Sequence, residues 1–153
     1  MSKNNFSYFV FNEINHAYLE SIIFLDQAYM DRCWEMKTWS SVICLDSSRV
    51  LLCTFEGEVV GFALFSLDPF CECPHLLKVA VRPSFRRMGV AQGIMRHATF
   101  FFSLYGSTRI ILDVDTKNTP AINLYKSLGF EVIHLRKRYY SDGADSFLLG
   151  LSI

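Results

Sequence analysis

The chain has 153 residues, of which 51% are hydrophobic and 15% aromatic, and fifteen basic residues balance fifteen acidic ones. A chain of this size and composition can bury one sizeable core, which argues against disorder and against a miniature fold held by disulfides. The balanced charge disfavours a nucleic-acid partner, because phosphate-backbone binding needs a broad positive field. No apolar run is long enough to span a membrane, and the first five residues lead into no signal-peptide core. We therefore expect one domain over residues 1–153, cytoplasmic and without a membrane partner.

The five cysteines are odd in number and scattered, and two of them lie inside apolar runs. This usage indicates reduced thiols that act as small hydrophobic residues. Cys71-Glu72-Cys73 has a spacing that suits two metal ligands, but it lacks the second ligand pair of a zinc site. The sequence therefore predicts no metal.

The first half of the chain predicts two helices followed by a β-hairpin. Apolar residues recur every three or four positions from Glu13 to about Met30, which is typical of an amphipathic helix. A second, short helix is expected at about Lys37–Leu45. Val50–Phe55 and Val59–Leu67 are β-branched and aromatic runs separated by Glu-Gly-Glu, which indicates antiparallel strands.

Strands and helices alternate in the second half, so the whole chain predicts a mixed α/β (α+β) fold with a partly antiparallel sheet. Thr119 is expected to cap the last helix, with Pro120 at its first position and Gly129 after its end. The expected elements are the strand Leu76–Val81, a helix from Val90 to about Tyr105, the strand Ile110–Val114, a helix from Thr119 to Leu128, and the strands Phe130–His134 and Phe147–Leu151.

The segment from Val79 to Ala91 carries the strongest functional pattern. A strand ends, a loop with paired arginines follows, and small residues stand at Gly89 and Ala91 where a helix begins. Gly89 lets the backbone approach a ligand closely, and the unpaired N–H groups of a first helical turn favour an anion. The segment suits a pyrophosphate, although R-x-x-G-x-A by itself is equally typical of an ordinary loop with solvated arginines.

In its context this segment resembles the coenzyme motif R/Q-x-x-G-x-G/A of the GNAT superfamily. It follows V-A-V-x-P and precedes a long helix, Asp113-Val114 and the patterned segment Asn118–Phe130. The resemblance implies the GNAT fold, in which a mixed, mostly antiparallel sheet flanked by helices is splayed at the coenzyme site, here between Leu76–Val81 and Ile110–Val114. It also implies acetyl-CoA as co-substrate. The implied coenzyme contacts are the main chain of Val79, Ala80 and Val81, the backbone of Arg86, Arg87, Met88, Gly89, Val90, Ala91 and Gln92, and Asn118.

Three further segments resemble the bacterial ribosomal-protein-alanine N-acetyltransferases. They are Asp26-Gln27-Ala28, Trp34-x-x-Lys37-x-Trp39 and the stretch from Arg136 to Phe147 that contains Tyr139-Tyr140. This resemblance implies that the acceptor is the N-terminal α-amine of a protein, namely a small-subunit ribosomal protein. Two alternatives are acetylation of a small amine or antibiotic and a catalytically silent acyl-CoA sensor.

The same resemblance implies two catalytic residues. Tyr125 matches the general acid near the coenzyme sulfur, its alternative role being core packing. Asp113 stands where the family has a glutamate general base, and since aspartate is one methylene shorter it would act through a water. Asp115 is a second candidate on the same strand face, with a turn role as its alternative. His75 is a candidate proton relay.

Two other positions bear on the acceptor side of the site. Lys78 replaces an asparagine that is common in the resembled family, which alters the expected substrate contacts. Tyr139-Tyr140 is expected either to line a peptide groove or to fill a half-buried strand.

Overall fold

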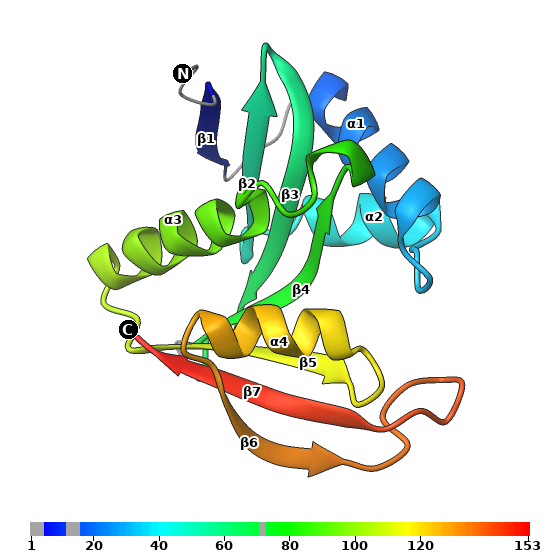
Figure 1. Cartoon of the computed structure of the whole chain (residues 1–153), viewed down its shortest axis with the longest axis vertical. Coiled ribbons are helices and arrows are strands. Elements are labelled where there is room, and N and C mark those ends of the chain that lie inside the picture. Colours follow the sequence, from blue (N-terminus) through cyan, green and yellow to red (C-terminus); the bar gives the residue numbers. More distant parts are fainter. Residues whose placement is uncertain (1–4, 12–15, 71–72) are drawn as a thin grey trace.

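The computed structural model describes residues 5–11, 16–70 and 73–153, and in them seven strands form one twisted sheet in the order β1-β2-β3-β4-β5-β7-β6 (Figure 1). All neighbouring strands in this described part are antiparallel except β4 and β5, which are parallel. The expected mixed, mostly antiparallel sheet is therefore confirmed. The strands are β1 (Phe6–Phe11), β2 (Ser48–Phe55), β3 (Glu58–Leu67), β4 (Pro74–Val81), β5 (Arg109–Asp115), β6 (Glu131–Arg136) and β7 (Ser146–Ser152).

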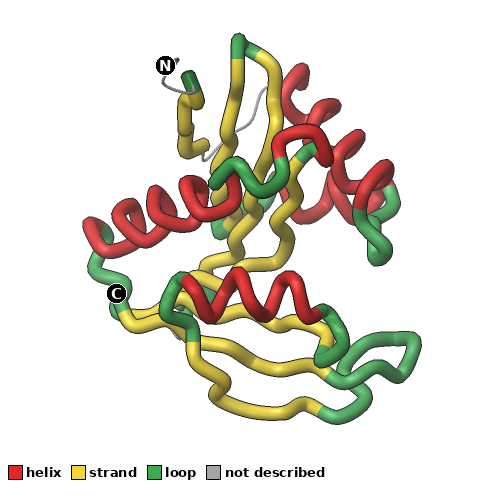
Figure 2. Tube along the Cα trace, viewed as in Figure 1, coloured by secondary structure: helices red, strands yellow, loops and turns green. Residues whose placement is uncertain are grey.

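Helices cover both faces of the sheet (Figure 2). The helices α1 (His16–Tyr29) and α2 (Met36–Ile43) share one buried apolar cluster with one face. The helices α3 (Val90–Leu104) and α4 (Thr119–Ser127) share a second cluster with the other face. The sheet thus separates two cores, and a short 3₁₀ turn, η1 (Pro83–Phe85), joins β4 to the α3 layer.

The first strand, β1, was not predicted from the sequence. It pairs with β2 at one edge of the sheet, and Tyr8 packs against α3 where Gly93 leaves room for it. A Cβ added to Gly93 would lie 2.1 Å from the Tyr8 hydroxyl, so a glycine is required for this contact. A single six-residue run far from the next expected strand gives little local indication of a strand, and its pairing with β2 forms only in the folded chain.

The cap of α4 was predicted one residue too late. Asn118 precedes the helix, and its side-chain oxygen accepts a hydrogen bond from the Ala121 amide at 3.3 Å. Thr119 is already helical, so it is not the capping residue. Asparagine is among the strongest N-cap residues, because its short side chain reaches the free amides of the first turn.

Some predictions fall outside the described residues, namely the first turn of the helix expected from Glu13, the residues 71 and 72 of the Cys-x-Cys segment, and residues 1–4. No helix in the described part combines the length and the apolar character that a bilayer crossing requires.

Candidate functional site

The sheet opens between β4 and β5. In the described residues these two strands pair only at His75 with Ile111 and at Leu76 with Leu112. Beyond Leu76, β4 continues to Val81 along β3, while β5 runs off in another direction (Figure 1). The edge of β4 that carries Val79–Val81 therefore faces no strand, and its backbone groups other than the Val81 carbonyl are available to an extended ligand. The implied splay is confirmed.

A β-bulge lies in β4 just above this opening. Leu76 pairs with Phe65 and Lys78 pairs with Leu64, so Leu77 has no partner in the ladder. Leu77 packs in the cluster of α1 and α2, and the Lys78 ammonium also bonds to α1, so two successive side chains point to the same face. Bulges are frequent beside active sites because they redirect side chains in this way.

The loop before α3 has the geometry of an anion site. Arg87 (φ 62°) and Gly89 (φ 82°) both adopt the left-handed conformation, which turns successive backbone amides toward one concave surface. The first helical backbone bond at this end runs from the Gly93 amide to the Gly89 carbonyl at 2.8 Å, and no side chain caps the first turn. The amides before Gly93 are thus left for a ligand.

Arg86 is exposed, but its side chain also bonds to the main chain of β4. Its Nε donates to the Val81 carbonyl at 3.1 Å, which ties the loop to the end of β4. The predicted coenzyme contacts of residues 79–81 and 86–92 therefore lie on one continuous surface beside the opening. Asn118, from the next strand connection, uses its side-chain oxygen to cap α4, and its amide nitrogen is the part that remains for a coenzyme contact.

Asp113 is the centre of a polar cluster on the face of β5 turned away from α3. Its side chain is 6% exposed, and its Oδ2 lies 3.2 Å from the Nε2 of His75 and 3.2 Å from the Nη1 of Arg136. The hydroxyl of Ser146 donates to the Oδ1 of Asp113 at 3.2 Å. Four different strands thus supply the cluster. The Tyr139 side chain also hydrogen-bonds to Asp113, so the carboxylate is shared among several donors rather than held ready for a substrate.

His75 is in turn oriented by Asp113. Burial lowers the pKa of His75, and Asp113 partly opposes this shift, so the imidazole is neutral at pH 7. When Nε2 carries the proton toward the carboxylate, the other ring nitrogen has a free lone pair. The structure therefore brings His75 and Asp113 into contact, a pair that the sequence indicated only as separate candidates.

Tyr125 lies in the α3–α4 core rather than in the cluster of Asp113. It is 6% exposed and its ring contacts Phe130 edge to face at 5.7 Å between centroids. Burial, and to a smaller extent Tyr140, raises the pKa of Tyr125, so its phenol keeps its proton at neutral pH. Burial also raises the pKa of Tyr140, with Asp113 contributing. Tyr140 therefore lies near enough to interact with both Tyr125 and Asp113.

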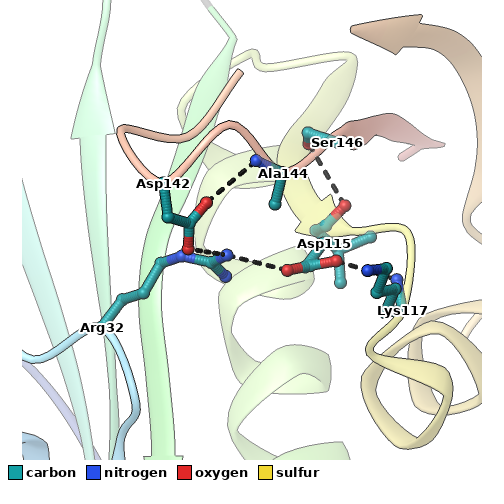
Figure 3. A network of polar contacts seen from close by, with 7 residues as sticks. Arg32, Asp115, Lys117, Asp142, Ala144 and Ser146 are labelled. Carbon is teal, nitrogen blue, oxygen red and sulfur yellow. Dashed lines mark hydrogen bonds and ion pairs between the residues drawn. The ribbon is translucent and has the colours of Figure 1, made fainter. Parts of the chain in front are cut away.

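Asp115 is held by groups other than His75 and Asp113. Its Oδ2 accepts from Arg32 Nη2 and its Oδ1 from the Lys117 amide, both at 2.8 Å (Figure 3). The Lys117 amide and then Arg32 lower the pKa of Asp115, which favours its ionised form. These contacts match the turn role weighed for Asp115.

Two charged residues make long-range contacts that were not predicted from the sequence. Asp26 forms a buried ion pair with Lys78 at 2.7 Å, and Arg32 bridges Asp115 and Asp142. Asp26 continues the apolar helical spacing of Ile22, which is an indication that an acidic side chain there is buried and paired. Nothing in the local sequence distinguishes Arg32.

Residues 9–130 match the sequence profile of the acetyltransferase (GNAT) family. The chain belongs to the GNAT acetyltransferase family. The resemblance of the sequence to GNAT proteins is thereby confirmed, and the sheet order and opening fit that fold.

Relatives of this GNAT chain include an N-alpha-acetyltransferase of Sulfurisphaera tokodaii, 32% identical over 61% of this chain and 63% of the relative. The chain thus spans less than two thirds of that protein. The crystal structure of the Escherichia coli ribosomal-protein-S18-alanine N-acetyltransferase superposes with a TM-score of 0.84 at 25% identity, covering 96% of this chain and 94% of the other. Arabidopsis thaliana NAA60 in complex with acetyl-CoA shares the fold, with a TM-score of 0.81 at 17% identity and coverage of 96% and 100%.

Proposed function

We propose that this protein transfers the acetyl group of acetyl-CoA to the N-terminal α-amine of a protein or peptide. The observation that carries the proposal is the arrangement around the opening between β4 and β5. An unpaired strand edge and an uncapped helix start lie on one side, and His75 paired with Asp113 lies on the other. The first side suits a long anionic coenzyme, and the second suits deprotonation of an amine. GNAT membership and the names of the relatives support the same reaction.

The residues on the coenzyme side fit such a molecule. Acetyl-CoA supplies the acetyl group as a reactive thioester. The backbone of Val79–Val81 would hold its extended arm, and the amides of residues 86–92 would hold the pyrophosphate. Gly89 supports this role because it has no side chain beside the amides. A Cβ built there would meet only the Gln92 side chain, at 3.8 Å, so no other part of the protein fills this space.

On the acceptor side, His75 takes the proton of the amine and Asp113 holds the imidazole in place. As the amine nitrogen forms its bond to the acetyl carbon, the carbon–sulfur bond breaks, and Tyr125 gives its phenolic proton to the departing sulfur. An α-amine suits a neutral imidazole base, because its reference pKa is about 7.7–8.0, against about 10.4 for lysine. This scheme keeps Tyr125 as the proposed general acid. It moves the proposed base from Asp113 to His75 and makes Asp113 the residue that positions His75.

The finer proposal is that the acceptor is a small-subunit ribosomal protein and that the reaction takes place in the cytoplasm. Its support is the likeness of residues 26–39 and 136–147 to ribosomal-protein-alanine acetyltransferases, together with the full-length superposition on the E. coli S18 enzyme.

The test is a hexapeptide that begins with Ala and carries one internal Lys, offered with acetyl-CoA beside the same peptide with a blocked N-terminus. Free lysine and an aminoglycoside serve as further acceptors. We expect mass spectrometry to locate the acetyl group on the α-amine of the unblocked peptide. Comparable acetylation of the blocked peptide, or turnover with the aminoglycoside alone, would refute the proposal.

A further inference from the structure

Arg32 lies in the connection between α1 and α2 and joins three segments that are far apart in the sequence. Its Nη2 lies 2.8 Å from the Oδ2 of Asp115, at the end of β5, and 2.8 Å from the Oδ2 of Asp142, in the connection between β6 and β7. Its guanidinium also lies 3.9 Å from the centroid of the Tyr140 ring. Figure 3 shows Arg32 reaching across from its own connection to both carboxylates.

The backbone of Arg32 is held by a buried side chain. The buried Lys78 ammonium donates to the Arg32 carbonyl at 2.8 Å and is itself paired with Asp26 at 2.7 Å. The main chain of Arg32 is therefore anchored to a buried ion pair, while its guanidinium lies at the surface. A surface arginine whose backbone is mobile would lose more rotamer and backbone freedom on making these contacts.

The two carboxylates share this cation. The charge of Asp142 opposes the ionisation of Asp115, as expected for neighbouring like charges, whereas Arg32 favours the ionised form of both. Without Arg32 the Asp115 and Asp142 carboxylates would repel each other, while the bond from the Thr116 amide to the Asp145 carbonyl would still join the two segments. These same segments carry Asp113 and Tyr140, which border the opening.

We infer that Arg32 is a positioning residue that holds the two connections in the form that binds the acceptor, and so sets acceptor affinity. The inference rests on the proposed function. The acceptor would otherwise have to order both connections with its own binding energy, which weakens its binding. Acetyl-CoA binds in the proposed scheme on the opposite side of the opening, so its affinity is independent of Arg32.

The test compares steady-state kinetics of the full chain and its Arg32→Ala variant on an Ala-initiated peptide with uncharged side chains. We expect the KM for the peptide to rise about tenfold, with kcat within threefold and the KM for acetyl-CoA unchanged. Arg32→Lys keeps the charge but lacks the planar fork that reaches two carboxylates, so it should restore only part of the affinity. Arg109→Ala, at the exposed opposite end of β5, is the matched control and should leave all three constants unchanged.

Two further measurements separate positioning from a general loss of structure. Combining Arg32→Ala with Asp142→Asn should raise the peptide KM no more than Arg32→Ala alone, because both remove the same link. The difference between wild type and Arg32→Ala should also shrink at high salt, which screens exposed ion pairs. A peptide KM within twofold of wild type in Arg32→Ala, or a change confined to kcat or to acetyl-CoA, overturns the inference. A wild-type enzyme that acetylates no peptide α-amine overturns the proposed function and this inference with it.

Discussion

Replacing Lys78 by methionine should destabilise the protein by about 3–5 kcal/mol, the usual cost of removing one partner from a buried ion pair. The Lys78 and Asp26 side chains are 3% and 0% exposed, so water cannot take the place of the lost ammonium. Asp26 would keep only two neutral donors, the Trp34 amide and the Trp39 indole, each at 2.8 Å. The Arg32 carbonyl would lose its bond to Lys78 as well.

A second substitution should recover most of this loss. In the double variant Asp26→Asn with Lys78→Met, the asparagine oxygen can still accept from both tryptophan N–H groups. Its amide nitrogen takes the place of the Asp26 Oδ1, and no buried charge remains. The gain of the double variant over Lys78→Met alone isolates the cost of an unpaired carboxylate from the loss of lysine packing.

The assay is urea unfolding followed by circular dichroism, with thermal unfolding beside it. For a domain of this size the loss corresponds to a fall in Tm of roughly 6–20 °C. Lys126→Met, an exposed lysine on α4, is the control and should stay within about 0.5 kcal/mol of wild type. A loss below about 1 kcal/mol for Lys78→Met, or a double variant less stable than the single one, would contradict the reasoning.

Three other predictions concern the proposed reaction. Gly89→Val should weaken acetyl-CoA binding by more than about tenfold in calorimetry, whereas Gly57→Val, with the same left-handed strain in an open turn, should leave binding unchanged. Tyr125→Phe should lower kcat by roughly 10²–10⁴ without changing acetyl-CoA affinity, and a fall under about threefold would restrict Tyr125 to packing. The kcat/KM of wild type should decline as the pH falls through the lowered pKa of His75 and the imidazole becomes protonated. Since Asp113 raises the pKa of His75, Asp113→Asn should move this decline to lower pH and reduce the maximum, and an unmoved profile would exclude the pair.

Features encoded by short-range patterns were predictable from the sequence. The helical spacing of α1 and α3, the hairpin of β2 and β3 and the glycine before α3 all depend on residues that are neighbours in the chain, and the structure has each of them within a few residues of its expected place. The cap of α4 was missed by one residue because Asn118 and Thr119 are both good capping residues, and only the backbone conformation decides between them.

The contacts that define the acceptor side were not predictable in this way. Arg32 and Asp142 are separated by 110 positions in the sequence, and Asp26 and Lys78 by 52. Which charged residues meet depends on the bulge in β4 and on the register of β5 with β7, neither of which leaves a local pattern. The pairing of His75 with Asp113 is of the same kind, since it requires β4 and β5 to be neighbours.

The two-residue ladder between β4 and β5 also bears on the stability of the folded protein. A ligand lying along the exposed edge of β4 would link two parts of a sheet that otherwise share few backbone hydrogen bonds. A ligand present at about a hundred times its Kd, and bound only by the native state, would add about 2.7 kcal/mol to the free energy of unfolding. Resistance to heat and proteases would then follow the supply of coenzyme, and the chain would be most vulnerable in cells that are depleted of it.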